Sequence, residues 1–206
     1  MKSASEFIAD VMADNCAVLY RCRWSDVDAQ RVVPRLTQIL SDNDPAVVDE
    51  ALRALFTIGT PAVAAASRVA PLIDSEHRIT RQLATLALGQ IAHKEPDLCV
   101  GPVTGALDRD ECRHDALRIL KFLGYAARSS IVKVASYYDS PDAKTRRLAA
   151  VTAIAIDAKS EVVQELATRV ESDRSKAVRT AVQKAIKAAQ QAVAHGPGTT
   201  RAAPGQ

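Results

Sequence analysis

The chain has 206 residues and a net charge of +3, and 48% of its residues are hydrophobic although only 4% are aromatic. No apolar stretch is long enough to span a bilayer, and the acidic residues among the first fourteen do not fit a secretion leader. The four cysteines show neither C-x-x-C spacing nor a disulfide-dense pattern, so we expect reduced thiols in a cytoplasmic protein.

The first segment, residues 1–24, carries apolar residues at helical spacing but matches no later segment. We expect it to form an N-terminal capping helix, because the end of a repeat array needs a polar outer surface. After Ala194 the apolar pattern stops, and residues 195–206 are rich in glycine and proline. This last segment is expected to form a flexible C-terminal tail.

From residue 25 to residue 194 the chain repeats one plan, in which a helix A, a short polar turn and a helix B follow one another. The B-helices align on a central alanine, and the steps between copies are 33, 32, 33 and 32 residues. These alanines are Ala51, Ala84, Ala116, Ala149 and Ala181. The period predicts one all-α solenoid over residues 1–194. Its repeats lie at about residues 25–59, 60–94, 95–125, 126–157 and 158–194.

The run D-x-D-P-x-V-V-x-x-A-L-x-A-L-x-x-I-G from Asp42 to Gly59 resembles HEAT repeats. The A-L-G-Q-I-A run from Ala87 to Ala92 resembles the HEAT-like repeats first named from phycobilisome lyases. The tetratricopeptide and ankyrin motifs, which have a similar period, are absent. The resemblance implies an armadillo-like, right-handed α-α superhelix of about five helix pairs, with A-helices on the convex side and B-helices lining the concave side.

On each B-helix, the positions two before, two after and five after the central alanine fall on the side opposite that alanine. We expect a mixture of basic and apolar side chains there to bind a partner protein. The candidate residues are Arg53, Phe56, Leu86, His114, Arg118, Lys121, Arg147, Val151, Ile154, Arg179 and Ile186. The apolar members predict an exposed docking ridge, unless A-helices or the N-terminal cap cover some of them.

A second row consists of Arg81, Arg113 and Arg146, each three residues before a central alanine. The resemblance implies that each arginine pairs with an acidic turn residue of the neighbouring unit, which would form a structural ladder. Ligand binding by the same row is the alternative.

The charge is uneven, with a net −3 over residues 1–105 and +6 over residues 106–206. The basic C-terminal half, residues 106–206, is either an ordinary solvated surface or the docking site of an acidic partner. Nucleic acid is a further alternative, because HEAT-like DNA glycosylases use a basic concave surface. The residues that could contact phosphates are Arg118, Lys121, Arg146, Arg147, Arg179, Lys184 and Lys187. Against this alternative, Tyr137 and Tyr138 end an A-helix on the wrong side of the turn for stacking on bases.

No catalytic constellation is recognisable: the P-loop, H-E-x-x-H and G-x-S-x-G motifs are all absent. Cys112 and His114 lack the second pair that a zinc site needs, and Asp42 and Asp44 lack the glycine and glutamate of a calcium loop. The sequence therefore predicts a non-enzymatic protein-protein interaction scaffold without cofactor or metal. DNA binding is the alternative. A bilin-lyase or chaperone-like activity is suggested only by the repeat subtype.

Overall fold

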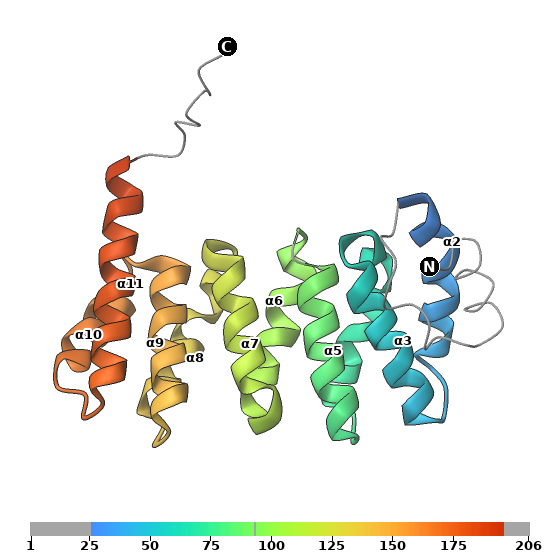
Figure 1. The fold of residues 1–206 in the computed structure, drawn as a ribbon, viewed down its shortest axis with the longest axis horizontal. Coiled ribbons are helices and arrows are strands. Elements are labelled where there is room, and N and C mark those ends of the chain that lie inside the picture. Colours follow the sequence, from blue (N-terminus) through green and yellow to red (C-terminus); the bar gives the residue numbers. More distant parts are fainter. Residues whose placement is uncertain (1–25, 93, 196–206) are drawn as a thin grey trace, which may run out of the picture.

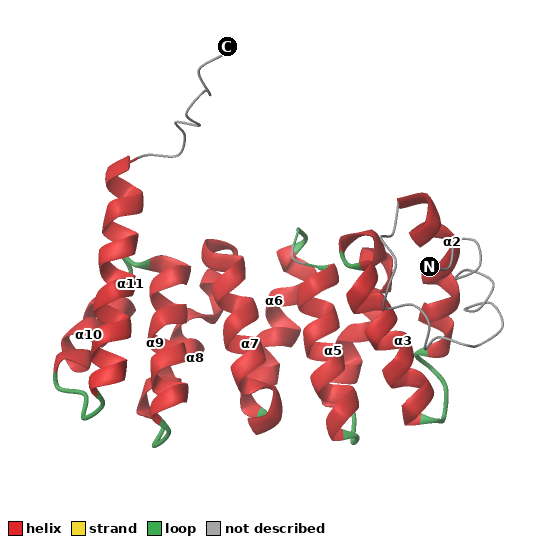
Figure 2. Ribbon diagram, in the orientation of Figure 1, coloured by secondary structure: helices red, strands yellow, loops and turns green. Residues whose placement is uncertain are grey.

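The computed structural model describes residues 26–92 and 94–195. Helices make up nearly all of these two ranges, which contain no strand and only short connecting turns (Figure 2). The prediction of an all-α fold is therefore confirmed. The predicted capping helix, residues 1–24, lies outside the described residues, as do residues 196–206 of the predicted tail.

The helices form five consecutive pairs, each with an A segment followed by a B-helix. The B-helices are α3 (Pro45–Ile58), α5 (Arg78–Ile91), α7 (Asp110–Leu123), α9 (Ala143–Asp157) and α11 (Lys176–His195). Two A segments are single α-helices, α2 (Asp26–Ile39) and α10 (Glu161–Glu171). The second A segment comprises η2 (Thr60–Ala65), α4 (Ala66–Val69) and η3 (Ala70–Asp74). The remaining A segments are α6 (Pro96–Gly105) with η4 (Ala106–Asp108), and η5 (Gly124–Ser130) with α8 (Ile131–Ser136) and η6 (Tyr137–Asp139).

The five B-helices lie side by side in chain order and form one layer, which we call the B-layer (Figure 1). The A segments pack behind it as a second layer. Helix α11 has 20 residues, whereas α9 has 15, so α11 extends beyond the end of the B-layer. This stacking of similar helix pairs is that of a solenoid, in which each unit contacts its neighbours.

Local signals fix where the B-helices begin and end. The side chain of Asp44 accepts a hydrogen bond of 2.9 Å from the backbone N–H of Ala46 and caps α3, which opens on Pro45. Glycines end α3 and α7, because Gly59 and Gly124 have positive φ angles of 73° and 55° that other residues rarely adopt.

Three of the A segments differ from the single α-helices that the repeat plan predicts. The second one is 3-10 helix at both ends, where Pro61 and Pro71 lack the N–H that would continue an α-helix. The fourth one starts directly after α7 at Gly124, and Ala127 inside it has a non-helical ψ of 17°. These A segments are therefore less regular than the B-helices that they support.

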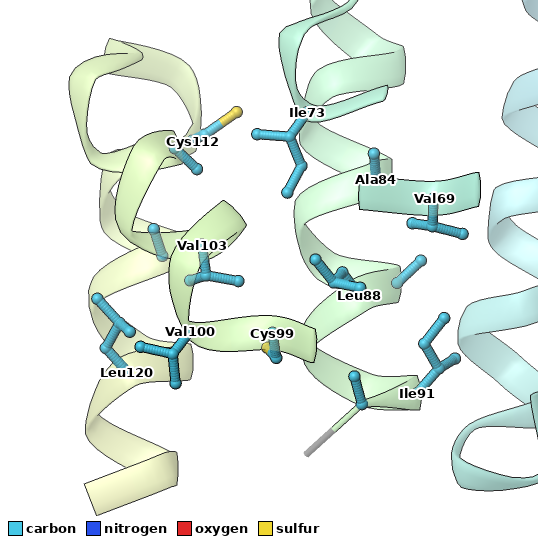
Figure 3. Close-up of a cluster of buried hydrophobic side chains, with 14 of the residues drawn as sticks. Val69, Ile73, Ala84, Leu88, Ile91, Cys99, Val100, Val103, Cys112 and Leu120 are labelled. Carbon is cyan, nitrogen blue, oxygen red and sulfur yellow. The ribbon is translucent and has the colours of Figure 1, made fainter. Parts of the chain in front are cut away.

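The hydrophobic core lies between the two layers. In its central part, Val69 and Ile73 of the second A segment, Leu88 and Ile91 of α5, and Val103 of α6 belong to one cluster of buried side chains (Figure 3). Four of the five repeated alanines are fully enclosed where the helices meet, as at Ala84 and Ala116 with 0% exposure. Small residues at this position allow close approach of the two layers. The large aliphatic side chains around them supply most of the apolar burial, and each one stabilises the fold by about 1.5–3 kcal/mol. Among the described residues, no helix is both long and apolar enough to cross a bilayer.

Candidate functional site

A groove of about 800 Å³ runs along the outer face of the B-layer between α9 and α11. Its floor is apolar and consists mainly of small side chains. The apolar lining residues are Leu148, Val151, Ile154, Ala155, Ile156, Ala158, Ala181, Ala185, Ala188 and Ala189. The residues that complete it are Lys121, Tyr125, Arg147, Asp157, Lys159 and Lys184. A groove of this volume can enclose several side chains of a bound molecule.

The groove exists because α9 and α11 carry alanine where other B-helices carry larger residues. Position Phe122 of α7 corresponds to Ala155 of α9 and Ala188 of α11, counted from the first residue of each helix. Phe122 is 73% exposed and projects from the surface, whereas the two alanines leave room between neighbouring helices. A run of alanines, each a strong helix former, thus produces a depression without weakening either helix.

Four basic side chains surround this floor. Arg147 and Lys159 lie near the two ends of α9, Lys121 approaches from α7, and Lys184 approaches from α11. None of these four side chains has a hydrogen bond or ion pair with another residue in the described part of the chain. The acidic lining residue, Asp157, is engaged by the turn after α9, where it accepts a hydrogen bond of 3.0 Å from the backbone N–H of Lys159.

The last repeat has a different register from the one that the alanine period predicts. Val182 is 1% exposed and occupies the position of the central alanine, whereas Ala181 is only half-buried and lines the groove. Arg179 accordingly donates to the carbonyl of Asp173, six residues earlier, as Arg146 donates to the carbonyl of Ser140. The structure thus corrects the role of Arg179, which belongs to the row of turn-binding arginines.

The corrected register changes which side chains of α11 face outward. Counted from Val182, the positions two and five residues further along are Lys184 and Lys187, and both lysines are exposed. Ile186 is half-buried and lines a smaller cavity of about 260 Å³ next to the groove, together with Val163 of α10. It is therefore not part of an exposed ridge.

The predicted docking ridge is also interrupted at other positions. Ile154 is only 4% exposed, because it packs between α9 and α11, where it contributes to the floor of the groove and of the smaller cavity. Leu86 is half-buried in the B-layer, whereas Phe56 is 43% exposed on α3. Arg53 forms an ion pair with Glu50 of its own helix. The structure does not bring these residues of α3 and α5 together with the groove.

His114 and Arg118 are also engaged within the protein. Nε2 of His114 lies 2.9 Å from Oγ1 of Thr145 on α9, and the pKa of His114 is lowered, chiefly by burial. A similar hydrogen bond to a threonine of the next B-helix joins α3 and α5, where Thr80 donates to Asp49 over 2.7 Å. Arg118 pairs with Asp115 at 2.9 Å. Of the predicted partner-binding residues, Lys121, Arg147, Val151 and Ile154 come together in the groove.

The predicted ladder arginines lie at the turns between A segments and B-helices. Arg81 pairs with Glu111, and Arg146 pairs with Asp173, in each case with an acidic residue of the following unit. Arg113 differs, because its ion-pair partner is Asp110 of its own helix, and its guanidinium lies 5.0 Å from the centre of the Tyr137 ring. These arginines are held in the turns and do not contribute to the groove.

The buried carboxylate of Asp173 accepts hydrogen bonds from several polar groups. It accepts hydrogen bonds from Nε of Arg146 at 2.9 Å and from the hydroxyl of Tyr138 at 2.8 Å. The hydrogen bond from Arg146 is the main reason why the pKa of Asp173 lies well below its ordinary value. Burial, with the Asp173 contact as a second cause, raises the pKa of Tyr138 to about 12. The arrangement neutralises a buried charge and leaves no acid poised for proton transfer near neutral pH.

The buried cysteines do not form a reactive or metal-binding site in the described ranges. Cys99 is completely buried among apolar side chains, and burial raises its pKa to about 11. Cys112 is also buried, and burial is the main cause of its raised pKa. Within residues 26–92 and 94–195, no group of three or more candidate metal ligands occurs.

Sequence reasoning missed part of the groove. Tyr125 follows the glycine that ends α7, so it fell outside the helical positions used to predict the outer face, yet it is 61% exposed and lines the groove. Lys159 was missed for a similar reason, because it lies beyond the last residue of α9. Lys184 was considered only as a phosphate contact. A helical count could not have placed Tyr125, because Gly124, with its positive φ, ends α7 before it.

Comparisons with known proteins identify the fold. The chain matches no protein-family model and no curated protein. It is similar to the structure of an engineered protein, with 18% identity and a TM-score of 0.64 over 93% of this chain and 98% of that chain. It is also similar to a designed armadillo repeat protein in complex with a (KR)4 peptide, with 15% identity and a TM-score of 0.69 over 91% of this chain and 99% of that chain. The fold is thus a helical-repeat solenoid similar to that of the designed armadillo repeat protein, while the HEAT subtype stays a prediction.

Proposed function

We propose that this protein is a non-catalytic scaffold that binds a segment of a partner protein in the groove between α9 and α11. The observation that carries the proposal is the open apolar floor, which is surrounded by cations that have no partner among the described residues. Protein-binding surfaces commonly combine an apolar centre with a polar rim. The predicted concave face of the B-helices would present this groove to the partner.

The composition of the groove supports binding in preference to catalysis. Its lining residues include no histidine, cysteine or serine, and no side-chain hydrogen bond joins its lysines to Asp157 or Tyr125 as a nucleophile would be joined to its base. The designed armadillo neighbour was solved with a (KR)4 peptide, so a solenoid of this fold can hold a peptide. That peptide is basic, whereas the rim of this groove is itself basic.

DNA binding is the second candidate, and the exposed Tyr125 beside Lys121 is the observation that favours it. However, Arg128 already lies over the Tyr125 ring, 5.5 Å from its centre, and donates a hydrogen bond to its hydroxyl. The apolar floor also has no counterpart in a sugar-phosphate backbone. A gel shift with mixed-sequence DNA at low salt tests this candidate, and a complex at micromolar protein would support it.

The scaffold proposal is tested by selecting random displayed peptides on the full chain and measuring their binding to groove variants. Ala155→Trp and Ala188→Trp each place a large ring in the groove at an exposed position, so neither should disturb the core. The matched control is Ala64→Trp, at an exposed site on η2. We expect selected peptides to bind the wild type and the control alike and to lose at least about tenfold in affinity with either groove variant. Equal binding to all four proteins would contradict the proposal.

A further inference from the structure

We infer that the groove between α9 and α11 recognises an acid-flanked apolar peptide segment, with apolar side chains at its centre and carboxylates toward both ends. The inference rests on the proposed scaffold function and names the chemistry of its partner. It follows from where the four groove cations lie relative to the apolar floor.

The four cations come from α7, from α9 and the turn after it, and from α11. Arg147 is near the first turn of α9 and Lys159 is just beyond its last residue, so they are separated by about 15 Å or more along the helix. Lys121 and Lys184 belong to α7 and α11, the B-helices on the two sides of α9, and both line the groove. A segment that fills the floor with apolar side chains would therefore meet positive charge at both of its ends and along its flanks.

In the part of the chain that the structure describes, these cations make no ion pair, whereas several other basic residues of the solenoid are paired with acidic side chains. Arg118 pairs with Asp115, Lys133 with Asp108, and Arg169 with Asp139. Within the described ranges, Lys121, Arg147, Lys159 and Lys184 make no such contact. Their charge is available to a ligand, and carboxylates placed next to them would provide electrostatic complementarity at the rim.

The floor distinguishes a peptide from other polyanions. Val151, Ile154 and the alanines of α9 and α11 offer apolar contacts that a phosphate backbone does not use. At about 15 Å, the floor accommodates about ten residues of a helix or about five residues of an extended chain. A short segment with a continuous apolar centre fits either case, whereas acidic residues alone would leave the floor unfilled.

The test analyses the composition of peptides selected on the full chain from a random library of about 12 residues, long enough to span the floor in either conformation. Peptides that bind the wild type but not Ala155→Trp are sequenced. We expect aspartate and glutamate to be enriched at both ends and aliphatic or aromatic residues at the centre. A synthetic peptide of the consensus sequence then serves as the probe, and the same peptide with glutamine in place of every acidic residue is its control.

The cations are tested with the double variant Arg147→Glu and Lys184→Glu. Both side chains are exposed and neither has an internal partner, so the fold should be retained. The control double variant, Arg68→Glu and Lys94→Glu, changes the net charge equally at exposed sites outside the groove. We expect the groove variant to bind the consensus peptide at least about tenfold more weakly, and the control to bind it within about twofold of wild type.

The possible failures are distinguishable. If no selected peptide depends on the groove, the scaffold proposal itself is wrong. If groove-dependent peptides are not enriched in acids, or bind equally well with glutamine, the scaffold proposal stands and the acid-flanked inference is overturned. Displacement of the consensus peptide by single-stranded DNA of equal length at equal concentration would also overturn it and would favour nucleic acid.

Discussion

Arg146 of α9 holds Asp173, a residue of the turn before α11, through two hydrogen bonds of 2.9 and 3.2 Å. The two side chains are 7% and 3% exposed, so the ion pair is almost completely enclosed between the fourth and fifth units. The same arginine donates to the carbonyls of Ser140 and Pro141. One guanidinium thus connects two turns and fixes the position of α11 relative to α9, the helices that form the groove.

Removing the charge of Asp173 should destabilise the protein strongly. Asp173→Asn keeps a side-chain oxygen for the Ser175 N–H but leaves Arg146 as an unpaired buried charge, so the free energy of unfolding should fall by about 3–5 kcal/mol. The matched control is Asp139→Asn, whose partner Arg169 is 45% exposed and whose loss should cost at most about 1 kcal/mol. Urea unfolding followed by circular dichroism measures both, and similar small losses in the two variants would argue against a buried pair.

The contribution of Asp173 should also depend on pH. Because Arg146 holds the folded pKa of Asp173 below its unfolded value of about 3.9, the stabilisation is fully present at higher pH and is lost as pH falls through the folded pKa. The difference in unfolding free energy between wild type and Asp173→Asn should therefore be constant above about pH 5 and shrink below about pH 4. Unfolding at a series of pH values checks this, and a difference that already shrinks between about pH 7 and pH 6 would contradict it.

Gly89 should not tolerate alanine, although glycine is normally unfavourable inside a helix. A Cβ at this position of α5 would lie 2.6 Å from Cδ1 and 2.9 Å from Cγ2 of Ile119 on α7. We expect Gly89→Ala to lower the free energy of unfolding by about 1–3 kcal/mol through overpacking. Gly105→Ala, in the same helical conformation with open space around it, should instead stabilise by up to about 1 kcal/mol.

The Ile119 side chain provides a second check on this contact. In the double variant Gly89→Ala with Ile119→Ala, the clash is absent, so the combined loss should be smaller than the two separate losses added together. Additive losses would mean that the two side chains do not meet as described.

Arg179 and Lys184 should separate stability from binding. Arg179→Ala removes the side chain that donates to the carbonyl of Asp173, and it should lower the free energy of unfolding by about 1 kcal/mol with little effect on peptide binding. Lys184→Ala removes an exposed side chain without a partner among the described residues, so it should weaken peptide binding and leave stability within about 0.5 kcal/mol. Thermal unfolding and fluorescence anisotropy measure the two properties. The opposite pattern would show that the register of the last repeat is the one predicted from the alanines.

The helix pairs were predictable because their signals are local. Ala84 or Ala116 with leucines one turn away indicates a helix and its buried side, and Gly59 or Gly124 indicates its end. The register of the last copy was not predictable in this way. Ala181 and Val182 are both apolar, and only the contact of Arg179 with the Asp173 carbonyl, which depends on the folded turn, selects Val182 as the buried residue.

The groove was less predictable than the fold because it depends on side chains that are small. The sequence prediction sought protruding residues such as Phe56 and Ile154, but the candidate site is the space that Ala155 and Ala188 leave between two helices. Whether such a space exists depends on how α9 and α11 pack. That packing is set by residues such as Asp173, which does not lie on the outer face of either helix. The sequence also does not show which basic side chains form ion pairs. Arg118, which pairs with Asp115, and Lys121, which is unpaired within the described ranges, were therefore both predicted to bind the partner.

The most direct measurement is the change in backbone amide chemical shifts when a groove-selected peptide is added to the isotope-labelled full chain. If the peptide binds between α9 and α11, the largest changes should occur at Val151, Ala155, Lys184 and Ala188, with little change in α3 or α4. Changes concentrated on α3, α4 or α6, with α9 and α11 unaffected, would contradict binding in the groove and place the partner site elsewhere on the solenoid.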